Sequence, residues 1–178
     1  KNGLWVVVAM HEPPTTTAWY LDKRDKELKA LETLRPDLVF SGNQHSYERF
    51  HPDFKPADTS KYSKGSGTIY IVSGGGGATL KPFADLQGLK KRSAPQNVLS
   101  SVAKRALMNH YLILEVSPTA IRGKTYRVCA AKDEKGGPNP RWKPEKKFWS
   151  SILISCDGLP AGTDLFDEFE IAAGDQGK

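Results

Sequence analysis

The run Trp5-Val6-Val7-Val8-Ala9 decides how the first part of this chain folds. It is a continuous, largely β-branched apolar stretch, which is typical of a strand buried on both faces of a parallel sheet. Pro13 and Pro14 end the strand, because proline cannot continue a central ladder. The sequence therefore predicts a buried strand over residues 5–9.

A helix and a second strand are expected next. Leu28, Leu31 and Leu34 repeat at helical spacing among charged side chains, so we expect a helix over residues 22–34. The apolar residues 38–40 predict a second short, buried strand. A crossover of this length that contains a helix makes the two strands parallel and the connection right-handed.

Two histidine-bearing segments follow these strands directly. His11 comes after the first strand, and His45 ends the turn Gly42-Asn43-Gln44-His45 after the second. Parallel strands bring their carboxyl ends to one edge of the sheet, which is where ligands bind in open α/β sheets. We therefore predict that the two histidine-bearing loops meet in space.

The rest of the chain is predicted to be mainly antiparallel β-structure. Gly74-Gly75-Gly76-Gly77 has no following Lys-Ser/Thr, so it predicts a turn that lets the backbone pass close to the site, not a phosphate-binding loop. His51 and His110 are expected to be surface residues, and Glu48 to be a salt-bridge partner. Further elements are expected as strands at 68–72, 111–116, 120–128 and 169–171, a short helix around 98–107, and a loop insertion over 132–147.

Composition narrows the class of protein. The chain has 178 residues, which suits one domain with a sizeable core. Its 38% apolar residues lie above the disordered range, and no stretch approaches the ~18–20 apolar residues of a membrane span. The 26 Lys and Arg residues against 20 Asp and Glu give a charge of +6. The basic residues are scattered in short groups, which argues against specific nucleic-acid binding, although a modest positive field helps to draw an anionic substrate.

The segment Gly42-Asn43-Gln44-His45-Ser46-Tyr47-Glu48-Arg49 resembles the GHxH-x-Y-E-R segment of the calcineurin-like metallophosphoesterases, especially their purple-acid-phosphatase-like branch. Val8-Ala9-Met10-His11 is similar to the VxxH motif that precedes it in that family. The resemblance implies an α/β fold that is part of a four-layer αββα sandwich, with antiparallel strands toward the carboxyl terminus. Residues 1–178 would be the carboxyl-terminal half of the catalytic domain and would give one sheet with its helices.

The same resemblance implies hydrolysis of phosphate esters at two metal ions, of Fe, Zn, Mn or a similar element. Such ions lower the pKa of a bound water and clamp the phosphate. By similarity, His45 would ligate the first metal, and His11 with position 43 the second, while Tyr47 and Arg49 would support the loop.

Position 43 departs from the family, because it is Asn where the family has His. A neutral amide oxygen is a poorer ligand for a d-block ion than imidazole, so the second metal is expected to bind more weakly. An introduced substitution, a naturally degenerate site and a tolerated Asn ligand are three open explanations.

The family's amino-terminal motifs, Asp-x-[His/Asp], GDxx[Tyr] and GNH[Asp/Glu], are missing from the chain. We therefore expect about half of a metal site, which would be inactive alone and would need the missing amino-terminal half or a second chain. Without those strands, the piece would expose an unpaired sheet edge.

The alternative is a non-catalytic binding or scaffold domain that keeps the fold with a degenerate metal site. Two cysteines neither require nor exclude an oxidising compartment. The Tyr-Glu-Arg triplet favours an extracytoplasmic location by resemblance.

Overall fold

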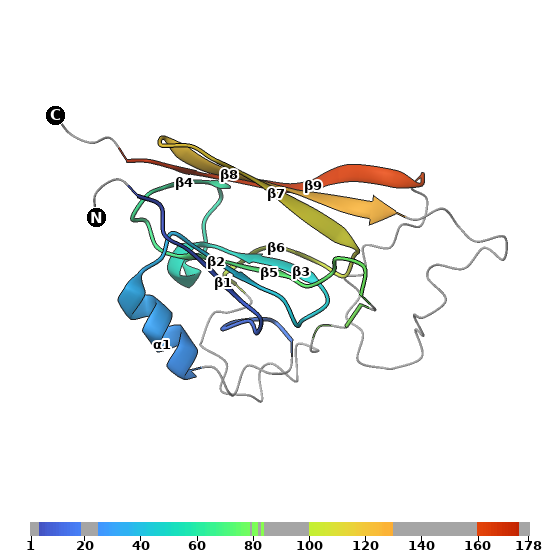
Figure 1. The fold of residues 1–178 in the computed structure, drawn as a ribbon, viewed down its shortest axis with the longest axis horizontal. Coiled ribbons are helices and arrows are strands. Elements are labelled where there is room, and N and C mark those ends of the chain that lie inside the picture. Colours follow the sequence, from blue (N-terminus) through green and yellow to red (C-terminus); the bar gives the residue numbers. More distant parts are fainter. Residues whose placement is uncertain are drawn as a thin grey trace.

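The computed structural model describes residues 4–18, 25–78, 80–81, 83, 100–129 and 160–174. Within these ranges, the chain forms a helix, a five-stranded sheet and a four-stranded sheet, stacked in that order (Figure 1). The helix is α1 (Asp25–Leu34), and a 3₁₀ turn spans Pro52–Phe54. The first sheet has the order β1 (Val7–Met10), β2 (Leu38–Ser41), β5 (Ile69–Ser73), β3 (Tyr47–Phe50) and β6 (Val102–Ala106). The second sheet has the order β4 (Lys61–Ser63), β9 (Gly162–Ala172), β8 (Ala120–Cys129) and β7 (His110–Val116).

The predicted strand–helix–strand unit is confirmed. β1 pairs with β2 in parallel, from Val7 opposite Leu38 to Met10 opposite Ser41. β2 in turn pairs with β5 in parallel. The carboxyl ends of three parallel strands therefore lie along one edge of the first sheet.

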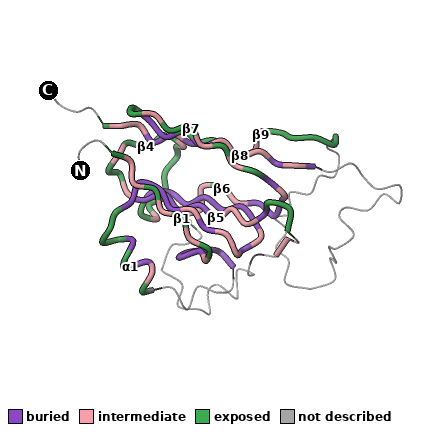
Figure 2. Tube along the Cα trace, viewed as in Figure 1, coloured by how far each residue is buried: buried purple, intermediate pink, exposed green. Residues whose placement is uncertain are grey.

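Two apolar cores hold the three layers together in the described residues. Figure 2 marks the buried residues of each layer in purple. Between α1 and the first sheet, Leu28 and Leu31 pack with residues of β2, β3 and β5. Between the two sheets, Ile69 and Ile71 of β5 pack with Phe169 of β9 and its neighbours. Successive side chains of a strand point to opposite faces, so the apolar residues 69–72 of β5 serve the two cores alternately.

β1 corrects one prediction, because it is not buried on both faces. Exposed and partly buried residues alternate along it, and Val7 is 43% exposed. Among the described residues, β1 is the end strand of its sheet and pairs with β2 alone. The apolar run thus identified a strand, but its sequence suits a central position that it does not occupy here.

The helix expected around residues 98–107 is also wrong, since residues 102–106 form β6. Ala, Lys and Arg favour helices in isolation. Antiparallel pairing of β6 with β3 overrides that local preference.

The chain contributes to two sheets, where the resemblance implied one. β3 and β4 were not predicted, and β9 is far longer than the expected strand at 169–171. The insertion expected at 132–147 lies outside the described residues. No helix in the described ranges is long and apolar enough to cross a membrane.

The exposed edge of β1 predicts self-association or pairing with further strands. Val7→Lys places a charge on this edge, so we expect it to raise the monomer fraction in sedimentation equilibrium. Leu34→Lys is the matched control, because Leu34 is similarly exposed but lies in α1, and its variant should associate like the wild type. A wild-type protein that stays monomeric at every concentration would contradict the prediction.

Candidate functional site

Three segments meet at the carboxyl ends of the parallel strands. We call residues 11–18, 42–46 and 74–78 together the strand-end edge. Gly42 N donates a hydrogen bond to His11 O at 2.9 Å, which joins the segments after β1 and β2. Gly74 N donates to Ser46 O at 3.2 Å, which adds the segment after β5. The two histidine-bearing segments are therefore in backbone contact, as the parallel pairing requires.

Glycine is needed where these segments touch. A Cβ added at Gly74 would collide with the carbonyl oxygen of Gln44. A Cβ at Gly75 would collide with Met108 O and the His110 ring. The glycine run therefore passes close to residues 42–46, as predicted.

The predicted ligand residues lie on this edge with different exposure. His11 is exposed, and His45 and Asn43 are partly buried. Asn43 has φ 54°, a left-handed conformation that Asn adopts more readily than most residues. The proximity of the two imidazole rings stays a prediction.

The donors present suit a d-block metal but do not complete a site. Two imidazoles and one amide oxygen are chemically suitable ligands. In the part of the chain that the structure describes, no group of three or more His, Cys, Asp or Glu side chains gathers to hold a metal. Further ligands would have to come from elsewhere.

Lys81 contacts the strand-end edge, although no sequence motif marks it. Its Nζ donates to Asn43 O at 2.7 Å, and its backbone N donates to His45 O at 3.1 Å. Gln44 Nε2 donates to Lys81 O at 2.9 Å. Lys81 thus forms hydrogen bonds with three successive residues, 43–45, and adds a positive charge beside them.

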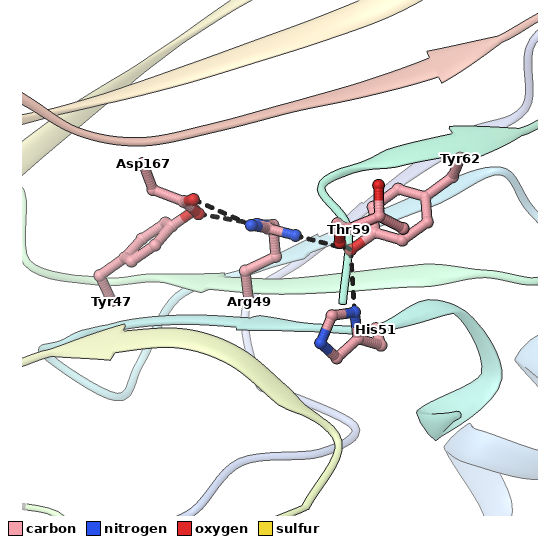
Figure 3. A network of polar contacts seen from close by, with 6 residues as sticks. All are labelled: Tyr47, Arg49, His51, Thr59, Tyr62 and Asp167. Carbon is pink, nitrogen blue, oxygen red and sulfur yellow. Dashed lines mark hydrogen bonds and ion pairs between the residues drawn. The ribbon is translucent and has the colours of Figure 1, made fainter. Parts of the chain in front are cut away.

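A buried polar network anchors β3, which continues directly from the His45 turn (Figure 3). Arg49 forms two hydrogen bonds with Asp167 of β9, from Nε to Oδ2 at 2.7 Å and from Nη2 to Oδ1 at 2.9 Å. Tyr47 donates to Asp167 Oδ2 at 2.8 Å. Both side chains of the ion pair are 2% exposed. The predicted loop-supporting residues thus bind the first sheet to the second.

The network continues toward β4. Arg49 Nη1 donates to the Tyr62 hydroxyl at 3.0 Å, and this hydroxyl donates to Thr59 O at 2.8 Å. Burial opposes the charge of Arg49, but hydrogen bonds to Asp167 and its negative charge raise the pKa of the guanidinium. Burial, with the charge of Asp167, raises the pKa of Tyr47. Sequence reasoning missed Asp167, because nothing local marks it as the partner of a residue 118 positions away.

His51 and His110 were expected at the surface, and both are buried. His51 Nδ1 shares a hydrogen bond with the Tyr62 hydroxyl at 2.9 Å. His110 shares hydrogen bonds with Ser73 Oγ through Nε2, at 2.9 Å, and with Met108 O through Nδ1, at 3.1 Å. Burial lowers the pKa of both imidazoles. Their side-chain partners, Tyr62 and Ser73, lie 11 and 37 positions away, and a single sequence does not show them.

Replacing one partner of the Arg49–Asp167 ion pair should destabilise the protein strongly. Arg49→Met or Asp167→Leu leaves a buried group without its partner, so we expect a loss of about 3–5 kcal/mol in the free energy of unfolding. The double variant Arg49→Met/Asp167→Leu should lose less than the sum of the single losses. Urea unfolding of all variants measures this.

The exposed pair Arg122–Glu170 is the control, since its side chains are 51% and 31% exposed. Breaking it should cost about 0–1 kcal/mol. Equal losses at both pairs would contradict the structural role assigned to Arg49 and Asp167.

Known proteins resemble the chain over much of its length. Probable purple acid phosphatase 20 of Arabidopsis thaliana is 32% identical over 134 residues, which cover 71% of this chain and 29% of that protein. A nucleotide pyrophosphatase/phosphodiesterase of Hordeum vulgare is 27% identical over 141 residues, covering 71% of this chain and 38% of that protein. Probable inactive purple acid phosphatase 1 of Arabidopsis thaliana is 38% identical over 69 residues, covering 36% of this chain and 11% of that protein. No protein-family model matches.

A solved structure has a similar fold. Purple acid phosphatase PPD1 from yellow lupin (Lupinus luteus) seeds superposes with a TM-score of 0.59 at 18% identity, over 95% of this chain and 25% of that chain. The chain spans less than two fifths of each of these proteins. Its motifs, its two mixed sheets and these similarities together identify it as the carboxyl-terminal portion of a purple-acid-phosphatase-like metallophosphoesterase.

Proposed function

We propose that the chain is the part of a phosphoester hydrolase that supplies ligands to a dinuclear metal site through His11, His45 and Asn43. One observation carries the proposal: the hydrogen bond from Gly42 N to His11 O, which joins the two ligand-bearing segments. Relatives named as phosphatases and a phosphodiesterase support phosphoester hydrolysis at the level of the family.

The residues at the strand-end edge would have different roles in phosphoester hydrolysis. Metal ions bound at such a site activate water and neutralise charge on the phosphate. His45 would hold the first ion, and His11 with the Asn43 amide oxygen the second. The Lys81 ammonium beside Asn43 adds positive charge that favours an anionic substrate.

The described residues do not bring together the further His, Asp or Glu ligands that a dinuclear site needs. We propose that an amino-terminal half or a second chain supplies them and pairs with the β1 edge. The exposure of Val7 on a strand whose sequence suits a central position supports this arrangement. Alone, residues 1–178 would be inactive.

A non-catalytic binding or scaffold domain is the second candidate. Asn43 favours it, because replacing an imidazole by an amide weakens the second metal position. In this case the fold and the strand-end edge would persist without stoichiometric metal.

Metal content and phosphatase activity of the complete protein separate the two candidates. With Mn²⁺ or Zn²⁺ added, we expect turnover of p-nitrophenyl phosphate and bound metal. Asn43→His should raise occupancy of the second position, and His45→Ala should lower total metal by about one equivalent. No turnover together with no stoichiometric metal would reject the enzyme and favour the scaffold.

We also propose an extracytoplasmic location, which the state of Cys129 supports. Cys129 is disulfide-bonded, and the other cysteine, Cys156, lies outside the described residues. Disulfides persist in exported proteins and are rare in the cytosol of mesophiles.

The thiol content of the protein from its natural source tests the location. Alkylation with iodoacetamide before reduction should leave Cys129 unlabelled, because its sulfur is in a disulfide. Alkylation after reduction should label both cysteines. Two labelled thiols without reduction would count against export.

A further inference from the structure

Glu48 is a fully buried carboxylate at the centre of β3, and none of the roles above uses it. Side chains alternate along a strand, so Glu48 points away from the second sheet, opposite Tyr47 and Arg49. Its buried position excludes direct contact with a ligand. Its hydrogen-bond partners show instead what it holds.

Those partners lie in the segment that follows His11. Thr17 N donates to Glu48 Oε2 at 2.7 Å, and Thr16 Oγ1 donates to Oε1. Residues 13–18 are all buried but form no helix or strand. Because the segment has no ladder of backbone hydrogen bonds, hydrogen bonds with side chains hold it in place instead.

Arg105 of β6 completes the attachment. It lies directly opposite Glu48 in the β3–β6 register, and its Nη1 donates to Thr17 Oγ1 at 2.9 Å. Its guanidinium also lies over the Phe83 ring, 4.8 Å from the centroid. Two charged side chains of neighbouring strands thus hold the segment at Thr16 and Thr17.

The segment between His11 and Thr17 is consequently fixed at both ends. Gly42 N binds it at His11 O, and Glu48 binds it at Thr16 and Thr17. Glu48 also belongs to the strand that continues from the His45 turn, three residues further along the chain. One carboxylate therefore connects both histidine-bearing segments.

We propose that Glu48 is a positioning residue, which sets the placement of His11 relative to His45 by holding Thr16 and Thr17 against β3. The inference rests on the metal site of the proposed function and adds a residue that acts on it only through the backbone.

The chemistry of the carboxylate supports a specific role. Burial opposes the ionised form and raises the pKa of Glu48, while the hydrogen bonds from Thr16 and Thr17 favour that form. A carboxylate offers two acceptor oxygens, one for each of these donors. An amide offers a single acceptor oxygen, so Glu48→Gln would leave one buried donor unsatisfied.

Co²⁺ titration of the complete protein, followed by visible absorption, tests the proposal. The d–d absorption bands of bound Co²⁺ report the arrangement of its ligands. If Glu48 only stabilised the fold, its substitution would leave these bands unchanged. We expect Glu48→Gln to weaken Co²⁺ binding by about tenfold and to change these bands, as loss of an orienting partner does at metal sites. Leu31→Ala is the control for stability, because it opens a cavity in the α1 core and should leave Co²⁺ affinity within about twofold.

A milder pair of variants keeps the test valid if Glu48→Gln does not fold. Thr16→Val removes one donor to Glu48 and should weaken Co²⁺ binding. Thr15→Val is its neighbour-matched control, because Thr15 is equally buried and its Oγ1 has no hydrogen-bond partner among the described residues. Thr15→Val should bind Co²⁺ like the wild type.

Each result decides between the proposals. Wild-type affinity and spectrum in both Glu48→Gln and Thr16→Val would overturn the positioning role and leave the metal site standing. Equal weakening in Thr15→Val or Leu31→Ala would also overturn it, since any destabilisation would then suffice. A wild-type protein that binds no Co²⁺ would reject the metal site itself.

Discussion

The buried ion pair between Arg49 and Asp167 is the interaction on which the rest of the arrangement depends. It joins the first sheet to the second at the strand that continues from the His45 turn. A buried ion pair adds little net stability over apolar packing, because desolvation offsets the attraction. Its contribution is to fix the position of β3 relative to β9, because Asp167 accepts hydrogen bonds from both Tyr47 and Arg49.

The triplet Tyr47-Glu48-Arg49 works on both faces of one short strand. Tyr47 and Arg49 face the second sheet, and Glu48 faces the segment after His11. The alternation of a strand turns three consecutive residues into two opposite attachments. The triplet therefore resembles part of a catalytic motif in the sequence but serves as scaffold in the structure.

The placement of the strand-end edge follows from the parallel sheet. Three parallel strands end together, and glycines after the third allow its backbone to pass against residues 42–46. Lys81 then secures that loop from a segment with no recognisable motif.

The sequence by itself determined the strand–helix–strand unit, its parallel pairing and the contact between the segments of His11 and His45. These features depend on the local spacing of apolar residues and on the geometry of short crossovers. Both can be recognised from one amino-acid sequence. The family resemblance added the expected chemistry of positions 11, 43 and 45.

Only the tertiary structure decided how charged residues are used. β3 and β6 carry Glu, Arg and Lys, which disfavour a buried-strand prediction, and they are strands because their charges meet partners far away in sequence. The burial of His51 and His110 has the same cause. A buried polar group is stable only with a partner, and which residue becomes that partner is set by the packing of sheets, not by neighbours along the chain.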